Sequence, residues 1–70
     1  MAVSYKKLWH LLLDRDMKKK DLKELAGLSD HTMKRLAHNE NVTTETLAKI
    51  SMALRCSLDD IVEFSADESR

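Results

Sequence analysis

Hydrophobic residues recur three and four positions apart along most of the chain, which is the spacing of one face of an α-helix. Ser4 is a good capping residue for a first helix that ends near residues 14–16, with hydrophobic positions at Tyr5, Leu8, Trp9 and Leu12. A second, shorter helix is predicted over residues 18–26, with one hydrophobic side made by Leu22, Leu25 and Ala26. Gly27 follows, where helices often close with a left-handed residue.

Three further helices are predicted by the same pattern. Ser29 caps a third helix, which ends in the polar stretch 38–41 and turns inward Met33, Leu36 and Ala37. Either Thr43 or Thr44 caps a fourth, which carries Leu47, Ile50 and Leu54. A fifth begins at Ser57, which forms a capping-box-like pattern with Asp60, and buries Leu58, Ile61 and Val62. We therefore expect an all-α, compact five-helix bundle over residues 1–64 and a frayed tail over residues 65–70.

Composition supports one small helical domain. The 70 residues include one Gly and no Pro, which leaves few of the turn residues that a sandwich or barrel of short strands needs. A single cysteine, Cys56, excludes an internal disulfide and suits a reducing compartment. We expect it to be a small core residue rather than a nucleophile, because free cysteines are commonly buried. Apolar runs such as Leu11 to Leu13 are far too short for a signal peptide or a membrane span, so a cytoplasmic protein with no membrane partner is expected.

The formal net charge of zero hides a division along the chain. Residues 1–38 hold nine Lys or Arg and five acids, a net charge of +4, whereas residues 39–70 hold three and seven, a net charge of −4. A polyanion is expected to meet the first half.

The joint between the second and third helices is the most informative segment. Two short helices linked through residues 26–29, with Gly27 at the corner, must cross steeply, as in a helix-turn-helix. At about 100° per residue, the outward side of the third helix carries a row of hydrogen-bond donors: His31, Lys34, Arg35 and His38. Asp30 and Thr32 flank this row at the end where a recognition helix reaches base edges.

From Leu11 to Val62 the chain resembles the Cro/repressor-type (XRE-like) helix-turn-helix regulators. The turn Gly27-Leu28-Ser29 sets the register, with Leu22 five residues before the glycine. Met33 and Leu36 follow Ser29 in the family's spacing, and the Thr-capped helix and the segment from Cys56 to Ile61 fit the rest of the pattern.

The resemblance implies a lambda-repressor-like fold and a sequence-specific transcriptional regulator, of the repressor kind, that binds double-stranded DNA as a homodimer. It implies base reading or nearby contacts by Asp30, His31, Thr32, Lys34 and Arg35. It implies phosphate contacts by Lys18, Lys19, Ser29, His38, Asn39, Asn41, Thr43 and Thr44. The self-contact is expected at the last helix, with Val62 and Phe64, and at the apolar edge of the first.

The chain departs from the family at three places. Lys18-Lys19 replaces a common Thr-Gln, which makes phosphate contacts more ionic. Leu12 and Ala37 stand where many relatives pair an Arg with a Glu. Because both positions are apolar here, no charge of that pair is left buried without its partner. Asn39 replaces a frequent Gly and tolerates the left-handed conformation better than most residues.

Other interpretations remain open. A basic helix face can be solvated surface, and the hydrophobic faces could serve a protein-binding module such as an antitoxin-like partner. Asp30 could stabilise its helix by placing negative charge near the positive end of the helix dipole, or it could accept a hydrogen bond from cytosine. Trp9 could pack in the core or contact a partner protein. His31 and His38 are seven residues apart, about 10 Å along a helix, too far to share one metal without more ligands. No cofactor is implied, and the absence of a catalytic constellation argues against an enzyme.

Overall fold

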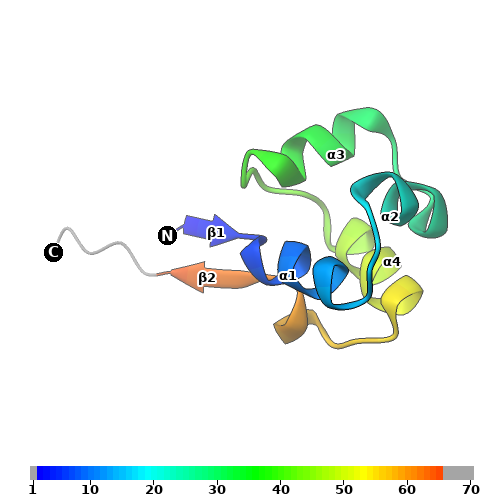
Figure 1. Cartoon of the computed structure of the whole chain (residues 1–70). Helices are drawn as coiled ribbons and strands as arrows, with labels where there is room; N and C mark the ends of the chain where they lie inside the picture. Colours follow the sequence, from blue (N-terminus) through cyan, green and yellow to red (C-terminus); the bar gives the residue numbers. More distant parts are fainter. Residues whose placement is uncertain (1, 66–70) are drawn as a thin grey trace, which may run out of the picture.

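The computed structural model describes residues 2–65, in which four α-helices share one core and a short two-stranded sheet projects at one end (Figure 1). The elements are β1 (Ala2–Ser4), α1 (Lys6–Asp14), α2 (Lys19–Ala26), α3 (Asp30–Ala37), α4 (Thr44–Leu54), the single 3-10 turn η1 (Leu58–Asp60) and β2 (Glu63–Ser65). The prediction of a compact helical domain is confirmed, but the fold is not all-α: the described residues form four α-helices rather than five, together with a two-stranded sheet.

Two capping side chains and one glycine set helix boundaries close to their predicted places. The hydroxyl of Ser29 accepts from the backbone N–H of Thr32 at 3.1 Å, and that of Thr43, rather than Thr44, accepts from Thr46 at 3.1 Å. Gly27 closes α2 with φ of +68°, as predicted. The exception is Ser4: it belongs to β1, and Tyr5 is the N-cap of α1.

Side chains from all four helices and the C-terminal segment form the hydrophobic core. Its buried members are Tyr5, Leu8, Leu12, Leu22, Leu28, Leu36, Ile50, Leu54, Ile61 and Val62. Leu25 and Ala37, which were predicted to face inward, are exposed. They are the last or next-to-last residues of eight-residue helices, and only one edge of so short a helix is covered by its neighbours.

The segment predicted as the fifth helix is a 3-10 turn followed by a strand. β2 pairs with β1 in antiparallel fashion, with Val3 opposite Phe64. Asp60 accepts from the backbone N–H of Ser57 at 3.1 Å, but the β-branched pair Ile61-Val62 and the aromatic Phe64 favour extended chain beyond this turn. Burial of Ile61 and Val62 is confirmed, whereas Leu58 is 43% exposed.

This change alters two other predictions. Val62 packs in the core and is only 7% exposed, so it cannot supply the predicted self-contact, whereas Phe64 is 61% exposed. Of the predicted tail, Ser65 ends β2, and residues 66–70 lie outside the described residues.

Tyr5 ties the loop after α3 to the start of α1. Its backbone N–H donates to the side-chain oxygen of Asn39 at 3.1 Å, and its buried ring directs the hydroxyl to the carbonyl of Glu40 at 2.7 Å. Asn39 has φ of +56°, the left-handed conformation expected for it. The loop that leads to α4 is therefore fixed by the N-terminal segment of the chain.

We predict a graded loss of stability at Asn39. Asn39→Gly removes the hydrogen bond to Tyr5 while tolerating the left-handed backbone, at a cost of about 1 kcal/mol. Asn39→Ala also strains the backbone and should cost about 1 kcal/mol more. Urea unfolding of the three proteins measures both steps, and equal stability of the Ala and Gly variants would contradict the second.

Candidate nucleic-acid interface

The outward face of α3 carries the donors predicted for it. α3 forms the upper edge of the molecule in Figure 1, and its inward residue Leu36 is fully buried. On the opposite side, His31, Lys34, Arg35 and His38 are all exposed. The turn through Gly27 and the buried Leu28 joins α3 to α2, so this row lies on a helix whose other side packs in the core.

A surface hollow joins α3 to the beginning of α4. Its volume is about 510 Å³, and its lining residues are His31, Thr32, Arg35, Asn41, Val42, Thr43 and Thr46. A smaller hollow of about 350 Å³ continues past Lys34 and His38. The structure thus brings together two sets of residues that the sequence analysis assigned to base and phosphate contacts.

Arg35 links α3 to the loop that follows it. Its Nε donates to Nε2 of His31 at 3.1 Å, and its Nη1 donates to the backbone carbonyl of Asn41 at 3.3 Å. The carboxylate of Glu40 lies 3.9 Å from the same Nη1. Arg35 is thereby held between its own helix and the loop while its side chain stays 44% exposed.

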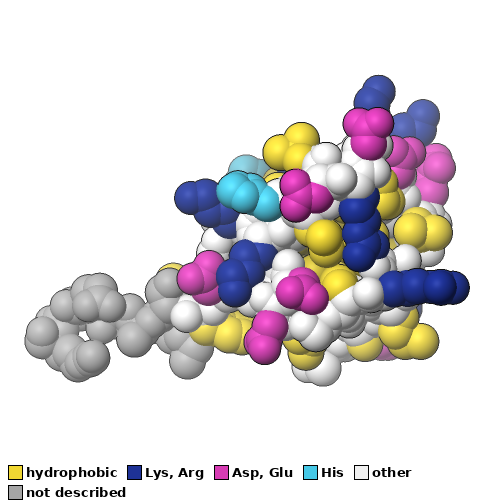
Figure 2. All heavy atoms as spheres, turned by 60° about the horizontal axis from the view of Figure 1, so that its bottom comes forward, with side chains coloured by type: hydrophobic (Ala, Val, Ile, Leu, Met, Phe, Trp, Pro, Cys, Tyr) yellow, Lys and Arg dark blue, Asp and Glu magenta, His cyan; other side chains and the backbone are white. Residues whose placement is uncertain are grey.

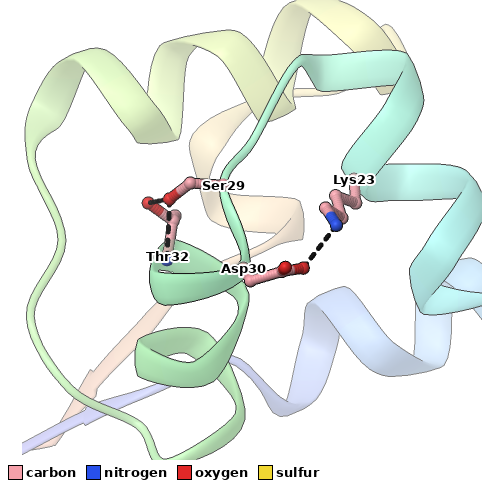
Figure 3. A network of polar contacts seen from close by, with 4 residues as sticks. All are labelled: Lys23, Ser29, Asp30 and Thr32. Carbon is pink, nitrogen blue, oxygen red and sulfur yellow. Dashed lines mark hydrogen bonds and ion pairs between the residues drawn. The ribbon is translucent and has the colours of Figure 1, made fainter.

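Polar contacts at the start of α3 connect it to α2 (Figure 3). Ser29 both accepts from the backbone of Thr32 and donates its hydroxyl proton to Thr32 Oγ1 at 3.0 Å. Asp30 forms an ion pair with Lys23 across the turn. The hydrogen bond and charge of Lys23 lower the pKa of Asp30, with a smaller contribution from Lys34. Asp30 therefore has a structural partner and also lies exposed at the first turn of α3.

Lys18 and Lys19 project from the start of α2. Both are exposed, and the carboxylate of Asp21 accepts from the backbone N–H of Lys18 at 2.9 Å. The ammonium of Lys19 lies 4.5 Å from the centre of the Trp9 ring, a cation–π contact. Trp9 itself is half-buried against the core, so it supports both the core and Lys19.

Sequence reasoning missed several residues of this surface. Val42 and Thr46 line the larger hollow, Lys23 pairs with Asp30, and Glu40 lies beside Arg35. Only Thr46 had a readable signal, because it follows the capping Thr43 by three residues and its hydroxyl is 2.9 Å from that of Thr43. The positions of Val42 and Glu40 depend on how the loop 38–43 folds back, and the contact of Lys23 with Asp30 depends on the turn between α2 and α3.

Charge on the face carrying α1 and η1 is mixed. Acidic and basic side chains are interspersed there with exposed hydrophobic ones (Figure 2). A hollow between the two elements is lined by Lys7, His10, Leu11, Asp14, Asp59 and Asp60, and Lys7 Nζ donates to the carbonyl of Asp59 at 3.2 Å. This face offers a polyanion no uniform positive charge.

Cys56 is half-buried against the core, in agreement with the structural role expected for it. Burial, and then the nearby charge of Asp60, raise the pKa of its thiol, while Arg15 acts in the opposite direction. Within residues 2–65, no cluster of three or more His, Cys, Asp or Glu side chains could hold a metal ion. None of the helices in this range has the length and apolar character needed to cross a membrane.

Comparison with known proteins places the chain beside DNA-binding regulators. Residues 7–67 match the profile of the Cro/C1-type HTH DNA-binding domain. Among solved structures, the crystal structure of the transcriptional regulator VanUg, Form II, is 50% identical, with a TM-score of 0.86 over 89% of this chain and 83% of that one. No curated protein matches the chain. The family resemblance inferred from the sequence is confirmed.

We predict that the carboxyl of Asp30 titrates below the usual aspartate pKa of about 3.9 in the folded protein. A carboxyl whose pKa is lowered by folding stabilises the folded state at pH values above its unfolded pKa. This contribution of Asp30 disappears as the pH falls through its folded pKa. Side-chain carboxyl NMR measures the titration directly. Lys23→Met should raise the pKa of Asp30 because it removes the paired cation. Added salt should raise it too, because the pair is exposed and salt screens it. Lys20→Met should leave the pKa of Asp30 nearly unchanged.

Proposed function

Because the chain belongs to the Cro/C1-type helix-turn-helix DNA-binding domain family, we propose that it is a sequence-specific transcriptional repressor that reads the major groove with residues 29–38. Its similarity to a transcriptional regulator over most of both chains supports a regulatory role. Repression needs only occupancy of the DNA, whereas activation also needs a contact that recruits the transcription machinery. Repression is therefore the simpler role for a domain of this size.

The observation that carries the proposal is the exposed row of donors on α3 beside the hollow that leads to α4. An α-helix with its side chains is about 10–12 Å in diameter, which fits the major groove, about 12 Å wide. With α3 in the groove, its outward residues can reach base edges. We assign base contacts to Asp30, His31, Thr32, Lys34 and Arg35, all exposed except the half-buried Thr32.

Phosphate contacts would flank the groove on both sides of α3. Lys18 and Lys19 lie at the start of α2, and the N-terminus of the eleven-residue α4 offers unpaired N–H groups and the positive end of its dipole. The remaining phosphate-binding candidates are Ser29, His38, Asn39, Asn41, Thr43 and Thr44, all of them exposed. This arrangement positions α3 without specifying sequence, since phosphate contacts carry no base information.

We predict strongly salt-dependent DNA binding. If about five cationic contacts form, the logarithm of the association constant should fall against the logarithm of salt concentration with a slope of about −4 to −5. Lys19→Gln should weaken binding to all sequences alike and reduce the slope by about 0.9. Fluorescence anisotropy with labelled duplexes measures both quantities.

Lys7→Gln is the matched control, because it removes the same charge from the face with the acidic hollow. It should leave the slope unchanged. A flat salt response would contradict DNA binding, and salt-insensitive capture of a protein would favour the protein-binding alternative.

We also propose that two copies bind DNA together. One recognition helix covers only a few base pairs, and paired helices on half-sites about 34 Å apart supply the missing specificity. Phe64 on β2 and Leu13 on α1 are 61% and 77% exposed, so they are candidates for the self-contact. Glu63 and the acidic residues of η1 lie near Phe64 in the chain and would keep that region away from phosphate.

We predict that sedimentation finds two chains on one preferred duplex. Phe64→Asp should convert this complex to one chain per duplex, because a buried contact cannot accommodate an unpaired charge. Ala48→Asp, an equally charged change at an exposed position of α4, serves as the comparison. A one-to-one complex of the unaltered protein would refute the dimer, and an unchanged complex of Phe64→Asp would refute this surface.

A further inference from the structure

The contact between Arg35 and His31 determines which nitrogen of His31 carries the proton. Arg35 Nε is always protonated and can only donate, so Nε2 of His31, 3.1 Å away, must be the acceptor. A neutral imidazole that accepts at Nε2 carries its proton on Nδ1. No hydrogen bond within residues 2–65 uses that Nδ1–H.

Arg35 is held in place from the other side. Its Nη1 donates to the carbonyl of Asn41, and Glu40 lies beside it at 3.9 Å. The loop that carries these two partners is fixed by Tyr5, whose hydroxyl donates to the carbonyl of Glu40. Tyr5 is therefore linked to the ring of His31 by its hydrogen bond to Glu40, by the backbone from Glu40 to Asn41 and by the two hydrogen bonds of Arg35.

The position of His31 on α3 makes the choice of its protonated nitrogen relevant to DNA recognition. It lines both hollows on the outward side of α3, the one shared with Asn41 and Thr43 and the one shared with Lys34 and His38. It is also the second residue of α3, near the end that meets base edges in helix-turn-helix complexes. A donor fixed at this position selects its partner by hydrogen-bond polarity.

We propose that Arg35, besides the base contact assigned to it, acts as a positioning residue that holds His31 as an Nδ1–H donor, so that His31 selects a base-edge acceptor in the major groove. This inference rests on the proposed DNA-binding function. The acceptors available there are N7 and O6 of guanine, N7 of adenine and O4 of thymine. The amino groups of cytosine and adenine present donors and are rejected by the same group.

The first test measures the tautomer of His31 in the free protein. Long-range proton–nitrogen NMR at about pH 8.5, where an ordinary imidazole is neutral, should place the proton of His31 on Nδ1. Arg35→Met should populate the Nε2–H form, and Lys34→Met, one residue away on the same exposed face, should leave Nδ1–H in place. An Nε2–H form in the unaltered protein, or no change in Arg35→Met, would overturn the positioning role.

The second test uses a duplex selected from random DNA. His31→Ala and Arg35→Met should each lower affinity for the preferred base at one shared position by about fivefold, the value of one neutral hydrogen bond. Since Arg35 acts partly through His31, the loss in the double variant should be smaller than the product of the two. His31→Ala combined with Lys34→Met should give the full product.

The outcomes separate this inference from the proposed function. Independent losses from His31 and Arg35 on a bound duplex would overturn the inference and leave DNA binding intact. An equal loss on all sequences from His31→Ala would identify a phosphate oxygen as the acceptor and overturn base selection. Failure to bind any duplex would refute both the proposed function and base selection, while the tautomer measurement would still decide how Arg35 holds His31.

Discussion

The burial of Tyr5 and its two hydrogen bonds to the loop after α3 are the contacts on which the proposed DNA-facing surface depends. The backbone of Tyr5 binds Asn39 and its hydroxyl binds Glu40, so both residues of the loop are tied to a buried residue of the core. Arg35 then joins this loop to α3 through the carbonyl of Asn41. The N-terminal segment of the chain thereby sets the distance between α3 and the start of α4.

Charged side chains are distributed unevenly between the surface of α2 and α3 and the face formed by α1 and η1. The helix-turn-helix exposes the row of donors on α3 and the lysines at the start of α2. Lys19 also makes a cation–π contact with the ring of Trp9. The acidic residues of η1 lie against α1, in a hollow that also holds Lys7. A duplex on α3 would meet mainly cations and hydrogen-bond donors, together with Asp30 and Glu40, whereas the acidic residues of η1 lie on a different face. The basic residues of α2 and α3 belong to the positively charged half of the sequence, and the acidic residues of η1 to the negatively charged half.

Features set by local sequence were predictable. Caps at Ser29 and Thr43, the left-handed Gly27 and the outward row on α3 each depend on residues within one or two helical turns. Features set by distant contacts were not. Pairing of β1 with β2 joins residues about 60 positions apart, and the segment expected to form a fifth helix is a 3-10 turn that leads into β2. The contact of Arg35 with Asn41 likewise depends on how the loop folds, which no pattern in the sequence reveals.

We propose that α3 and the start of α4 form one DNA-facing surface. Backbone amide shifts of the labelled protein during titration with a selected duplex would map this surface. We expect the largest changes on residues 29–38, on residues 41–46 and at Lys18 and Lys19, with small changes on the exposed face of α1 and on η1. The largest changes on α1 and η1, with α3 unaffected, would contradict it.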